Sequence, residues 1–397
     1  MKNHFSAILY YILSRFFIIL PFKRNYIYCI SFRGQYNGNP KAISQALNKI
    51  RPNTRYIWEI SSKSKECLPT NVTPVEPNSI KAIWWRSRCK VVIDNYLGWE
   101  YGYAESNGIK YWLLRRQKKK RQLNICTWHG VPLKKIGCDM PDNHGKAELF
   151  YTTADCLVSK SKYMSSIFEH LTNNKIRILT TGWPRNDLLF NKDERLRSSL
   201  KAKLQLPADK RVVLYAPTFR KDGAYMSGIY QIEKLNILYL LKIISDKYGG
   251  EWVFVFRAHD SVFQDIPISF FQEKQALNGN VGDDMSEYLL VSDVLITDYS
   301  GSLFDYCVTY KPCFLYCPDY DNYSQVERGL YMEMSELPFS ISRTEDDLYS
   351  AIRSFDESKY MAAVHSFLKK TGDGDDGHAS DRVAEIIDSY LRPDCNL

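Results

Sequence analysis

The chain has 397 residues, which is more than one ordinary hydrophobic core covers, so the length alone predicts two domains. Hydrophobic residues make up 45% of the sequence and charged residues 25%, and these proportions exclude an intrinsically disordered chain. The formal net charge of +8 favours an anionic partner, without distinguishing a phosphate ligand from a nucleic acid or an acidic lipid.

The sequence contains ten cysteines, scattered without a CxxC pair. No cluster of histidines and cysteines has the spacing of a zinc site. We therefore expect reduced, mostly buried thiols in a cytosolic setting. The same spacings predict no metal site, and we expect no cofactor.

The N-terminal segment from Phe5 to Phe22 is mostly apolar and is followed by two basic residues. It lacks the small-residue cleavage site of a signal peptide. It is barely long enough to span a bilayer, and Arg15 near its middle would be costly there. We therefore expect residues 1–24 to form a helix that lies in the membrane interface, with the protein peripheral on the cytoplasmic face of the cell membrane. A helix packed on its own domain is the alternative.

From residue 26 onward, short apolar runs alternate with helical stretches. This alternation predicts an α/β protein with two doubly wound parallel-sheet domains that face each other across a cleft. A helix is expected to begin with Asn39 as its N-cap and Pro40 in its first turn. The expected strands are Tyr26–Phe32, Arg55–Ile60, Val91–Asp94, Leu123–Thr127, Cys156–Ser159 and Ile176–Thr180, then Val212–Tyr215, Trp252–Phe256, Val294–Thr297 and Cys313–Tyr316.

The pattern breaks near residues 182–210, where a turn-forming Gly-Trp-Pro is followed by a polar helix, Lys192–Leu204. We therefore expect an N-terminal domain of residues 25–183 and a C-terminal domain of residues 184–397. A terminal helix, Ser380–Leu391, is long enough to pack back on the N-terminal domain.

Five motifs fall where expected strands end, which is the edge of an open α/β sheet at which ligands bind. The first, Trp128-His129-Gly130, places a histidine directly after a buried strand, a position suited to chemistry rather than to packing. The other four are Gly182-Trp183-Pro184-Arg185-Asn186-Asp187, Ala216-Pro217-Thr218-Phe219-Arg220, Arg257-Ala258-His259 and Thr297-Asp298-Tyr299-Ser300-Gly301-Ser302-Leu303-Phe304-Asp305.

These motifs predict a pyrophosphate site with two histidines beside it. Arg220 and Arg257 end neighbouring strands of the second sheet, and arginine forks bind phosphate oxygens. Ser300 opens an expected helix whose free N–H groups favour anions. Each residue alone has a structural alternative: a surface ion pair for Arg220, a helix cap for Ser300, a cap or ion pair for Asp298 and Asp305, and a buried structural role for His259.

Together the motifs resemble those of the CDP-glycerol glycerophosphotransferase family, whose members prime and polymerise wall teichoic acids and some capsules. The resemblance extends from about Leu123 to Gly329, and more weakly over Ser31–Leu47 and Gly377–Val383. It implies a GT-B-like fold, with the acceptor on the N-terminal domain and the donor on the C-terminal domain. The implied reaction moves glycerol phosphate, or a related polyol phosphate, from CDP-glycerol to a lipid-linked saccharide or polyol-phosphate polymer and releases CMP.

Carried over residue by residue, the resemblance implies that His129 and His259 are catalytic. The implied substrate-binding residues are Trp128, Gly130, Val131, Pro132, Arg185, Pro217, Thr218, Arg257, Ala258, Ser300, Gly301 and Asp305, with Arg220, Asp298 and Arg328 as further candidates. Four positions depart from the usual pattern: Val131 where threonine is common, Trp183 for tyrosine, Asp260 for proline and Gly301 for a second serine. These departures leave the reaction class intact and bear on the identity of the polyol.

In the mechanism that these groups predict, neutral His129 takes the proton of the acceptor hydroxyl as general base. Arg257, His259 and the Ser300 turn offset charge on the pyrophosphate and on departing CMP. Phosphoryl transfer depends mainly on positioning and electrostatics, so we expect a direct displacement without an enzyme-bound intermediate.

The basic run Arg115–Arg121 comes without the aromatic stacking motifs of RNA-binding domains, so we expect no nucleic-acid partner. We expect it to touch anionic headgroups or a phosphate-rich polymer, with a solvated loop as the alternative. Two rival functions remain: a GT-B glycosyltransferase that uses a nucleotide sugar, and a non-catalytic membrane module that binds an anionic polymer. The polyol, the number of units added, the pathway and the oligomeric state stay open.

Overall fold

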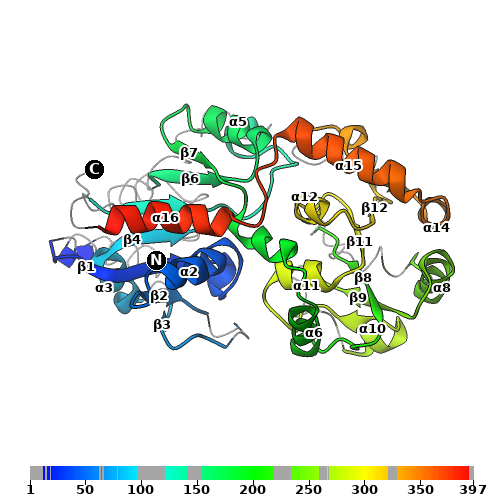
Figure 1. The fold of residues 1–397 in the computed structure, drawn as a ribbon, viewed down its shortest axis with the longest axis horizontal. Coiled ribbons are helices and arrows are strands. Elements are labelled where there is room, and N and C mark those ends of the chain that lie inside the picture. Colours follow the sequence, from blue (N-terminus) through cyan, green and yellow to red (C-terminus); the bar gives the residue numbers. More distant parts are fainter. Residues whose placement is uncertain are drawn as a thin grey trace, which may run out of the picture. The chain divides into compact units, whose positions relative to one another are not determined.

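The structure is a computed structural model that describes residues 12–13, 16–17, 19–61, 64, 67–77, 79–95, 121–140, 154–218, 232, 234–258, 266, 268–320 and 329–392. The chain divides into two compact units, each built on one parallel sheet (Figure 1). The predicted α/β class with two parallel sheets is therefore confirmed. Unit 1 comprises Met1–His129, Gly137–Asp187 and Asp373–Leu397, and unit 2 comprises Gly130–Ile136 and Leu188–Gly372.

The sheet of unit 1 has seven strands in the order β3-β2-β1-β4-β5-β6-β7. Its central strands are buried almost throughout, as expected for a parallel sheet covered on both faces. The strands are β1 Lys23–Ile30, β2 Arg55–Glu59, β3 Val72–Val75, β4 Cys89–Asp94, β5 Leu123–Cys126, β6 Cys156–Ser159 and β7 Arg177–Thr180. The helices are α2 Gly38–Ile50, α3 Ile80–Arg88, α5 Lys162–Leu171 and α16 Ala379–Leu391.

Helix α16 is the last helix of the chain, and it lies beside α2 in unit 1 (Figure 1). Its buried residues recur at helical spacing, which gives it one apolar face. At the rim of this contact, the Arg51 guanidinium is 2.8 Å from the Asp388 carboxylate. The C-terminal residues thus contribute to the same unit as the N-terminal sheet.

The sheet of unit 2 has six strands in the order β10-β9-β8-β11-β12-β13, and its core is rich in aromatic side chains from β8, β9 and β12. The strands are β8 Arg211–Tyr215, β9 Trp252–Phe256, β10 Leu277–Asn278, β11 Val294–Thr297, β12 Cys313–Tyr316 and β13 Ser340–Ser342. The helices are α6 Glu194–Lys203, α8 Ile237–Tyr248, α10 Ile268–Glu273, α11 Met285–Val291, α12 Ser302–Tyr306, α14 Glu345–Arg353 and α15 Glu357–Thr371.

All ten expected strands are present, with ends that differ by a few residues. The expected N-cap of the first helix was wrong: Asn37 occupies that position, and Asn39 lies inside α2. The physical reason is that the Asn39 side chain hydrogen-bonds to the loop after β5 instead of to its own helix end.

Of the expected N-terminal helix, the structure describes only residues 12–13, 16–17 and 19–24, and most of that prediction lies outside the described residues. The described side chains of Ile12 and Phe16 are largely exposed. Within the described part of the chain, no helix combines the length and the apolar character needed to cross a bilayer.

Candidate functional site

The loop after β5 carries the predicted histidine, and its backbone is strained. Trp128 has φ = 53°, in the left-handed region that a bulky residue rarely adopts, at a cost of about 1–3 kcal/mol. The buried Trp128 ring packs 4.5 Å from the His129 ring and 5.6 Å from the Phe168 ring, measured between centroids. The packing of this ring stabilises the unusual backbone and fixes the direction in which His129 leaves the strand.

The imidazole of His129 is neutral at pH 7. Burial lowers its pKa to about 4, against a hydrogen bond with the Asn95 backbone that raises it, and the Arg185 cation lowers it further. The Nδ1 atom lies 3.3 Å from the carbonyl oxygen of Asn95, which can only accept, so Nδ1 carries the proton. Nε2 therefore keeps the lone pair that a general base needs.

Arg185 is a charged partner of this loop. Its Nη1 donates to the carbonyl oxygen of His129 at 3.0 Å, and its guanidinium lies 4.4 Å from the centre of the Trp183 ring. It is the second residue of the 3-10 helix Pro184–Phe190, and three residues separate that helix from the end of β7. The structure thus brings two of the sequence-predicted residues, His129 and Arg185, together within unit 1.

Two asparagines that we had not predicted as site residues hold this loop. Asn39 donates to the carbonyl oxygen of Thr127 at 3.0 Å and accepts from the backbone N–H of Arg185 at 3.1 Å. The side-chain oxygen of Asn95 accepts a hydrogen bond from the Thr127 hydroxyl at 2.5 Å. The indole N–H of Trp183 also donates to the Thr127 carbonyl, at 3.2 Å. The usable sequence signal was a polar amide directly after an apolar strand, as at Asn95.

In unit 2, the loop after β8 is tied to the end of β11. The fully buried carboxylate of Asp298 accepts from the backbone N–H of Thr218 at 2.8 and 3.0 Å, and also from the Thr218 hydroxyl. Pro217 is buried beside it. Asp298 therefore holds the Pro217–Thr218 backbone in place. Its hydrogen bonds bring two of the sequence-predicted motifs together.

Arg257 follows β9 and donates hydrogen bonds to backbone. Its Nη1 donates to the carbonyls of Gly279 and Gly282 at 2.6 and 2.9 Å, and its guanidinium lies 4.7 Å from the centre of the Tyr288 ring. Ala258 pairs through its N–H and C=O with the side chain of buried Asn280, at 3.0 and 2.8 Å. Its Nη2 also donates to the carbonyl of Asp283 at 3.3 Å, so at most two of the five guanidinium N–H groups of Arg257 remain for the phosphate role that we predicted.

The Ser300–Asp305 segment forms a turn and the short helix α12. The Ser300 hydroxyl accepts from the backbone N–H of Ser302 at 3.3 Å, as a local cap. Gly301 has helical φ and ψ, and a Cβ there would lie 3.4 Å from the Val131 carbonyl oxygen. Asp305 is buried in α12. Because α12 has only five residues, its dipole is small, and the anion-binding role that we predicted would depend mainly on the backbone N–H groups of the turn.

The chain passes from unit 1 to unit 2 between His129 and Gly130. Residues Gly130–Ile136 then pair with the segment around Leu330: the Lys135 N–H donates to Gly329 at 2.9 Å and the Tyr331 N–H donates to Leu133 at 2.9 Å. Val131 and Pro132 are buried in this arrangement. The single most specific sequence motif therefore contributes residues to both units.

Three predicted site residues, His259, Arg220 and Arg328, lie outside the described residues, as does the basic run up to Lys120. Their predicted roles stay predictions.

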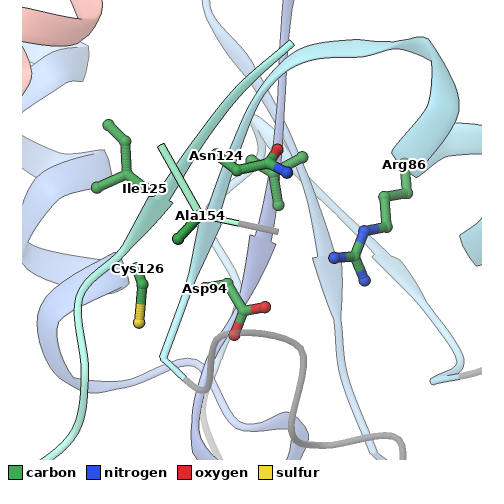
Figure 2. A pocket seen from close by; sticks show the side chains of 7 residues that line it. Arg86, Asp94, Asn124, Ile125, Cys126 and Ala154 are labelled. Carbon is green, nitrogen blue, oxygen red and sulfur yellow. The ribbon is translucent and has the colours of Figure 1, made fainter. Parts of the chain in front are cut away.

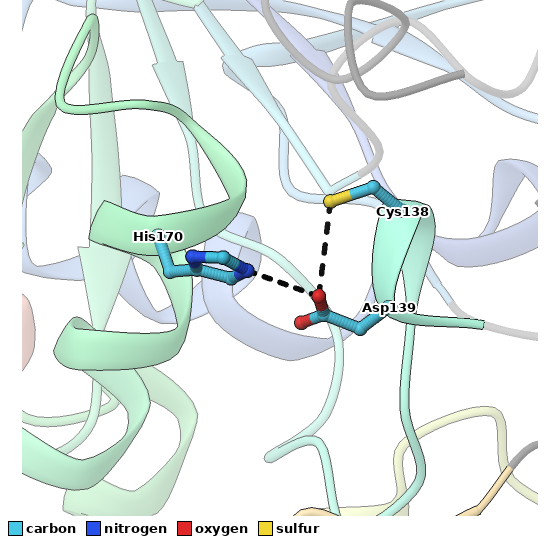
Figure 3. A group of neighbouring side chains, drawn as sticks. All are labelled: Cys138, Asp139 and His170. Atoms are coloured by element: carbon cyan, nitrogen blue, oxygen red, sulfur yellow. Dashed lines mark hydrogen bonds and ion pairs between the residues drawn. The ribbon is translucent and has the colours of Figure 1, made fainter. Parts of the chain in front are cut away.

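One group in unit 1 offers three ligand atoms of the types that zinc takes: Cys138, Asp139 and His170 (Figure 3). His170 Nε2 lies 3.0 Å from an Asp139 oxygen, and its side chain is 66% exposed. None of the three residues belongs to the motifs at the strand ends. We assign this group a surface hydrogen bond between His170 and Asp139 and no step of a reaction.

A small cavity lies beside β4 and β5, where Asp94, Asn124 and Cys126 line it (Figure 2). Its volume of about 10 Å³ is no larger than the space of one water molecule. It is therefore too small to be a substrate site.

Comparison with known proteins identifies the family. The model of the family described as CDP-Glycerol:Poly(glycerophosphate) glycerophosphotransferase matches residues 12–389. The teichoic acid glycerol-phosphate transferase of Staphylococcus aureus is 32% identical over 92% of this chain and 93% of its own length. The teichoic acid poly(glycerol phosphate) polymerase of Staphylococcus epidermidis is 31% identical over 91% of this chain, which spans only about half of that longer protein (50%).

Solved structures agree with the sequence comparison. The wall teichoic acid polymerase TagF superposes with a TM-score of 0.76 at 27% identity, over 98% of this chain and 96% of that one. Staphylococcus aureus MnaA in complex with UDP has a TM-score of 0.51 at 15% identity, which shows a shared fold alone. The chain belongs to the CDP-glycerol:poly(glycerophosphate) glycerophosphotransferase family and has its GT-B-like fold.

Proposed function

We propose that this protein transfers glycerol phosphate from CDP-glycerol to a hydroxyl of a lipid-linked saccharide or glycerol phosphate polymer and releases CMP, in teichoic acid or capsule synthesis. Family membership supports the reaction class, and a solved TagF variant was obtained with CDPG. The observation that carries the proposal is the neutral imidazole of His129 at the end of β5, with Nδ1 toward the Asn95 carbonyl.

The proposed chemistry is one displacement at phosphorus. Nε2 of His129 takes the proton of the acceptor hydroxyl as its oxygen forms a bond to the glycerol-bearing phosphorus. The phosphoanhydride bond to CMP breaks, and CMP leaves with the electron pair. The proton that His129 gains passes to solvent after the product leaves. His259 and nearby donors offset the negative charge on the departing phosphate.

The low pKa of His129 suits this reaction in a specific way. In the free protein, burial keeps the imidazole unprotonated over the whole physiological range. The donor brings negative charge, and a nearby anion raises the pKa of an imidazole. Binding of CDP-glycerol would therefore strengthen the base at the moment when the acceptor hydroxyl must be deprotonated.

We place the donor on the C-terminal domain, residues 184–397, and the acceptor on the N-terminal domain, residues 25–183, which carries His129. On the donor side, Thr218 and Arg257 lie at the carboxyl ends of adjacent strands, since β8 and β9 are neighbours in the sheet. The Ser300–Gly301 turn follows β11, the strand on the other side of β8. Strand order therefore supports one donor site formed by three motifs.

We place the protein at the cytoplasmic face of the membrane, held by residues 1–24 and by the basic run Arg115–Arg121, because its proposed acceptor is linked to lipid. Vesicle flotation of the full chain tests this placement. Binding to vesicles with anionic lipid that is lost at high salt supports it, and absence of binding contradicts it.

A panel of donors tests the reaction. Purified full-length protein is incubated with a lipid-linked acceptor and CDP-glycerol, CDP-ribitol or a UDP-sugar, and the acceptor product is weighed by mass spectrometry. We expect a mass gain of one or more glycerol phosphate units with CDP-glycerol. A ribitol phosphate product alone would change the polyol, and a sugar product alone would favour the glycosyltransferase alternative.

A further inference from the structure

We propose that Asp375, in the loop between α15 and α16, is a positioning residue that holds Arg185, and through it the His129 loop, in the geometry used for transfer. We name residues Asp373–Gly377 the aspartate loop. The proposal rests on the proposed function for its kinetic test, whereas its geometric test needs no substrate.

Asp375 is bonded on both carboxylate oxygens to the segment that carries Arg185. Its Oδ1 accepts from the backbone N–H of Trp183 at 2.5 Å, and its Oδ2 accepts from the side-chain amide of Asn186 at 2.7 Å. Trp183 and Asn186 are the residues on either side of Pro184–Arg185. One carboxylate therefore fixes the turn at both of its ends.

The charge of Asp375 is itself held by a buried cation. The Lys160 ammonium, whose side chain is 1% exposed, lies 3.0 Å from Asp375 and also pairs with Asp373. The Lys160 carbonyl oxygen accepts from the N–H of Gly374 at 2.9 Å, so the aspartate loop also bonds to Lys160 through its backbone. A lysine buried to this degree requires paired carboxylates, because an isolated buried charge is strongly unfavourable.

The aspartate loop and the Arg185 turn approach so closely that side chains are excluded. Gly182 has φ = 81°, and a Cβ there would lie 2.5 Å from the Gly374 carbonyl oxygen. Further along, Asp187 accepts from the N–H groups of Ala379 and Ser380 at 2.9 and 2.7 Å. The turn that bears Arg185 is thus bound to the start of α16 as well as to Asp375.

This arrangement links the aspartate loop to the imidazole in two steps. The Arg185 N–H is held by Asn39, and its guanidinium holds the His129 carbonyl. A shift of the turn would move the only charged group that acts on the pKa of His129 among its described neighbours. Because misplacement by about 1 Å can cost 100-fold in rate, a residue that never touches substrate can still control transfer.

Asp375→Asn tests the proposal. The asparagine retains one oxygen for the Trp183 N–H. It presents an amide to the Asn186 amide and to Lys160, so the turn loses its hydrogen bond through Asn186. We expect kcat/KM for CDP-glycerol to fall about 10-fold or more. The discriminating step is the same substitution in an Arg185→Gln background. If Asp375 acts through Arg185, the second loss is at most about 2-fold, because the effects of coupled residues do not add.

The second test needs no substrate, because it measures the pKa of His129 by NMR titration of the imidazole signals. The signal that is absent from His129→Asn identifies His129. We expect the pKa of His129 to rise in Asp375→Asn. The variant should still unfold cooperatively on heating, which shows that it is folded. Asn186→Ala, which removes one donor and leaves the Lys160 pair, is the milder variant if Asp375→Asn does not fold. Asp356→Asn is the matched control, because Asp356 is exposed, pairs with Lys359 at the start of α15, and should change kcat/KM less than about 2-fold.

Two results would overturn the proposal: an unchanged His129 pKa in both Asp375→Asn and Asn186→Ala, or kinetic losses that add fully to that of Arg185→Gln. If wild-type protein releases no CMP from CDP-glycerol, the proposed function fails, and the NMR titration alone decides whether Asp375 positions Arg185.

Discussion

The guanidinium of Arg185 donates a hydrogen bond to the backbone carbonyl of His129 across 3.0 Å. This hydrogen bond fixes the backbone of the loop, whereas the imidazole ring is oriented by its hydrogen bond with the Asn95 carbonyl. The cation also acts with burial to disfavour a protonated imidazole. One arginine thereby orients the proposed base and helps to keep it unprotonated.

Replacing this arginine separates the two effects. Arg185→Gln keeps an amide that can donate to the His129 carbonyl but removes the charge. We expect kcat/KM to fall about 10- to 100-fold, which corresponds to the 1.5–3 kcal/mol of a hydrogen bond from a charged group. The pKa of His129 should rise, because a cation no longer opposes protonation. Arg185→Lys, which keeps the charge, should leave that pKa nearly unchanged; equal pKa values in all three proteins would refute the account.

The pH dependence of the wild-type protein follows from the same pKa. A base with a pKa of about 4 is unprotonated above that pH, so kcat/KM should stay level as the pH falls from 7 to 5. It should then decline about tenfold per pH unit below about 4. Steady-state rates at limiting CDP-glycerol, corrected for protein that has unfolded, measure this limb. A decline that begins near pH 6.5 would show an ordinary, solvated imidazole instead.

Asp298 should matter for stability and for donor binding. Asp298→Asn replaces one buried acceptor oxygen by an amide, which cannot accept from the Thr218 N–H or hydroxyl. The loss should lower the free energy of unfolding by about 1–3 kcal/mol and raise KM for CDP-glycerol more than it lowers kcat. Thr218→Ser keeps both donors and is the matched control. Urea denaturation with unchanged midpoints in Asp298→Asn would contradict the assignment.

Two glycines in unit 2 should differ in how much stability an added side chain costs. Gly301 has helical dihedral angles, and a Cβ there would lie 3.4 Å from Val131, at the limit of ordinary contact. Gly301→Ser should therefore fold, keep its activity and lose less than about 1 kcal/mol in unfolding free energy. Gly279→Ala would place its Cβ 2.8 Å from the Phe256 carbonyl oxygen and should cost about 1–3 kcal/mol. Thermal unfolding of both variants is the measurement. An equal loss of unfolding free energy in the two would contradict the spacing given for Gly279 and Gly301.

The sequence predicted the central strands of both sheets, because a strand buried on both faces is an uninterrupted apolar run. It missed β3, β10 and β13, which are all edge strands of their sheets. Edge strands bury less apolar surface: β10 is only partly buried, and β3 contains Pro74, which is tolerated because it lies on an edge. Their sequences carry no strong strand signal for this reason.

Within the candidate site, His129 and Arg185 were predictable because each follows an expected strand. The contacts of Asn39 and Asn95 were not, because they depend on strand order: β1 and β4 are neighbours in the sheet although β2 and β3 lie between them in sequence. The same limit applied to the aspartate loop, whose glycines and aspartates are typical of a loop and do not indicate what it contacts. Its bonds to Trp183 and Asn186 exist because α16 returns to unit 1.

The most direct test of the central claim is CMP release from CDP-glycerol with a lipid-linked acceptor, compared between wild type and His129→Asn. The account predicts acceptor-dependent release by the wild type, and a rate about 10²- to 10⁴-fold lower in the variant at an unchanged thermal midpoint. Release by His129→Asn within a few-fold of the wild-type rate would show that His129 is not the base.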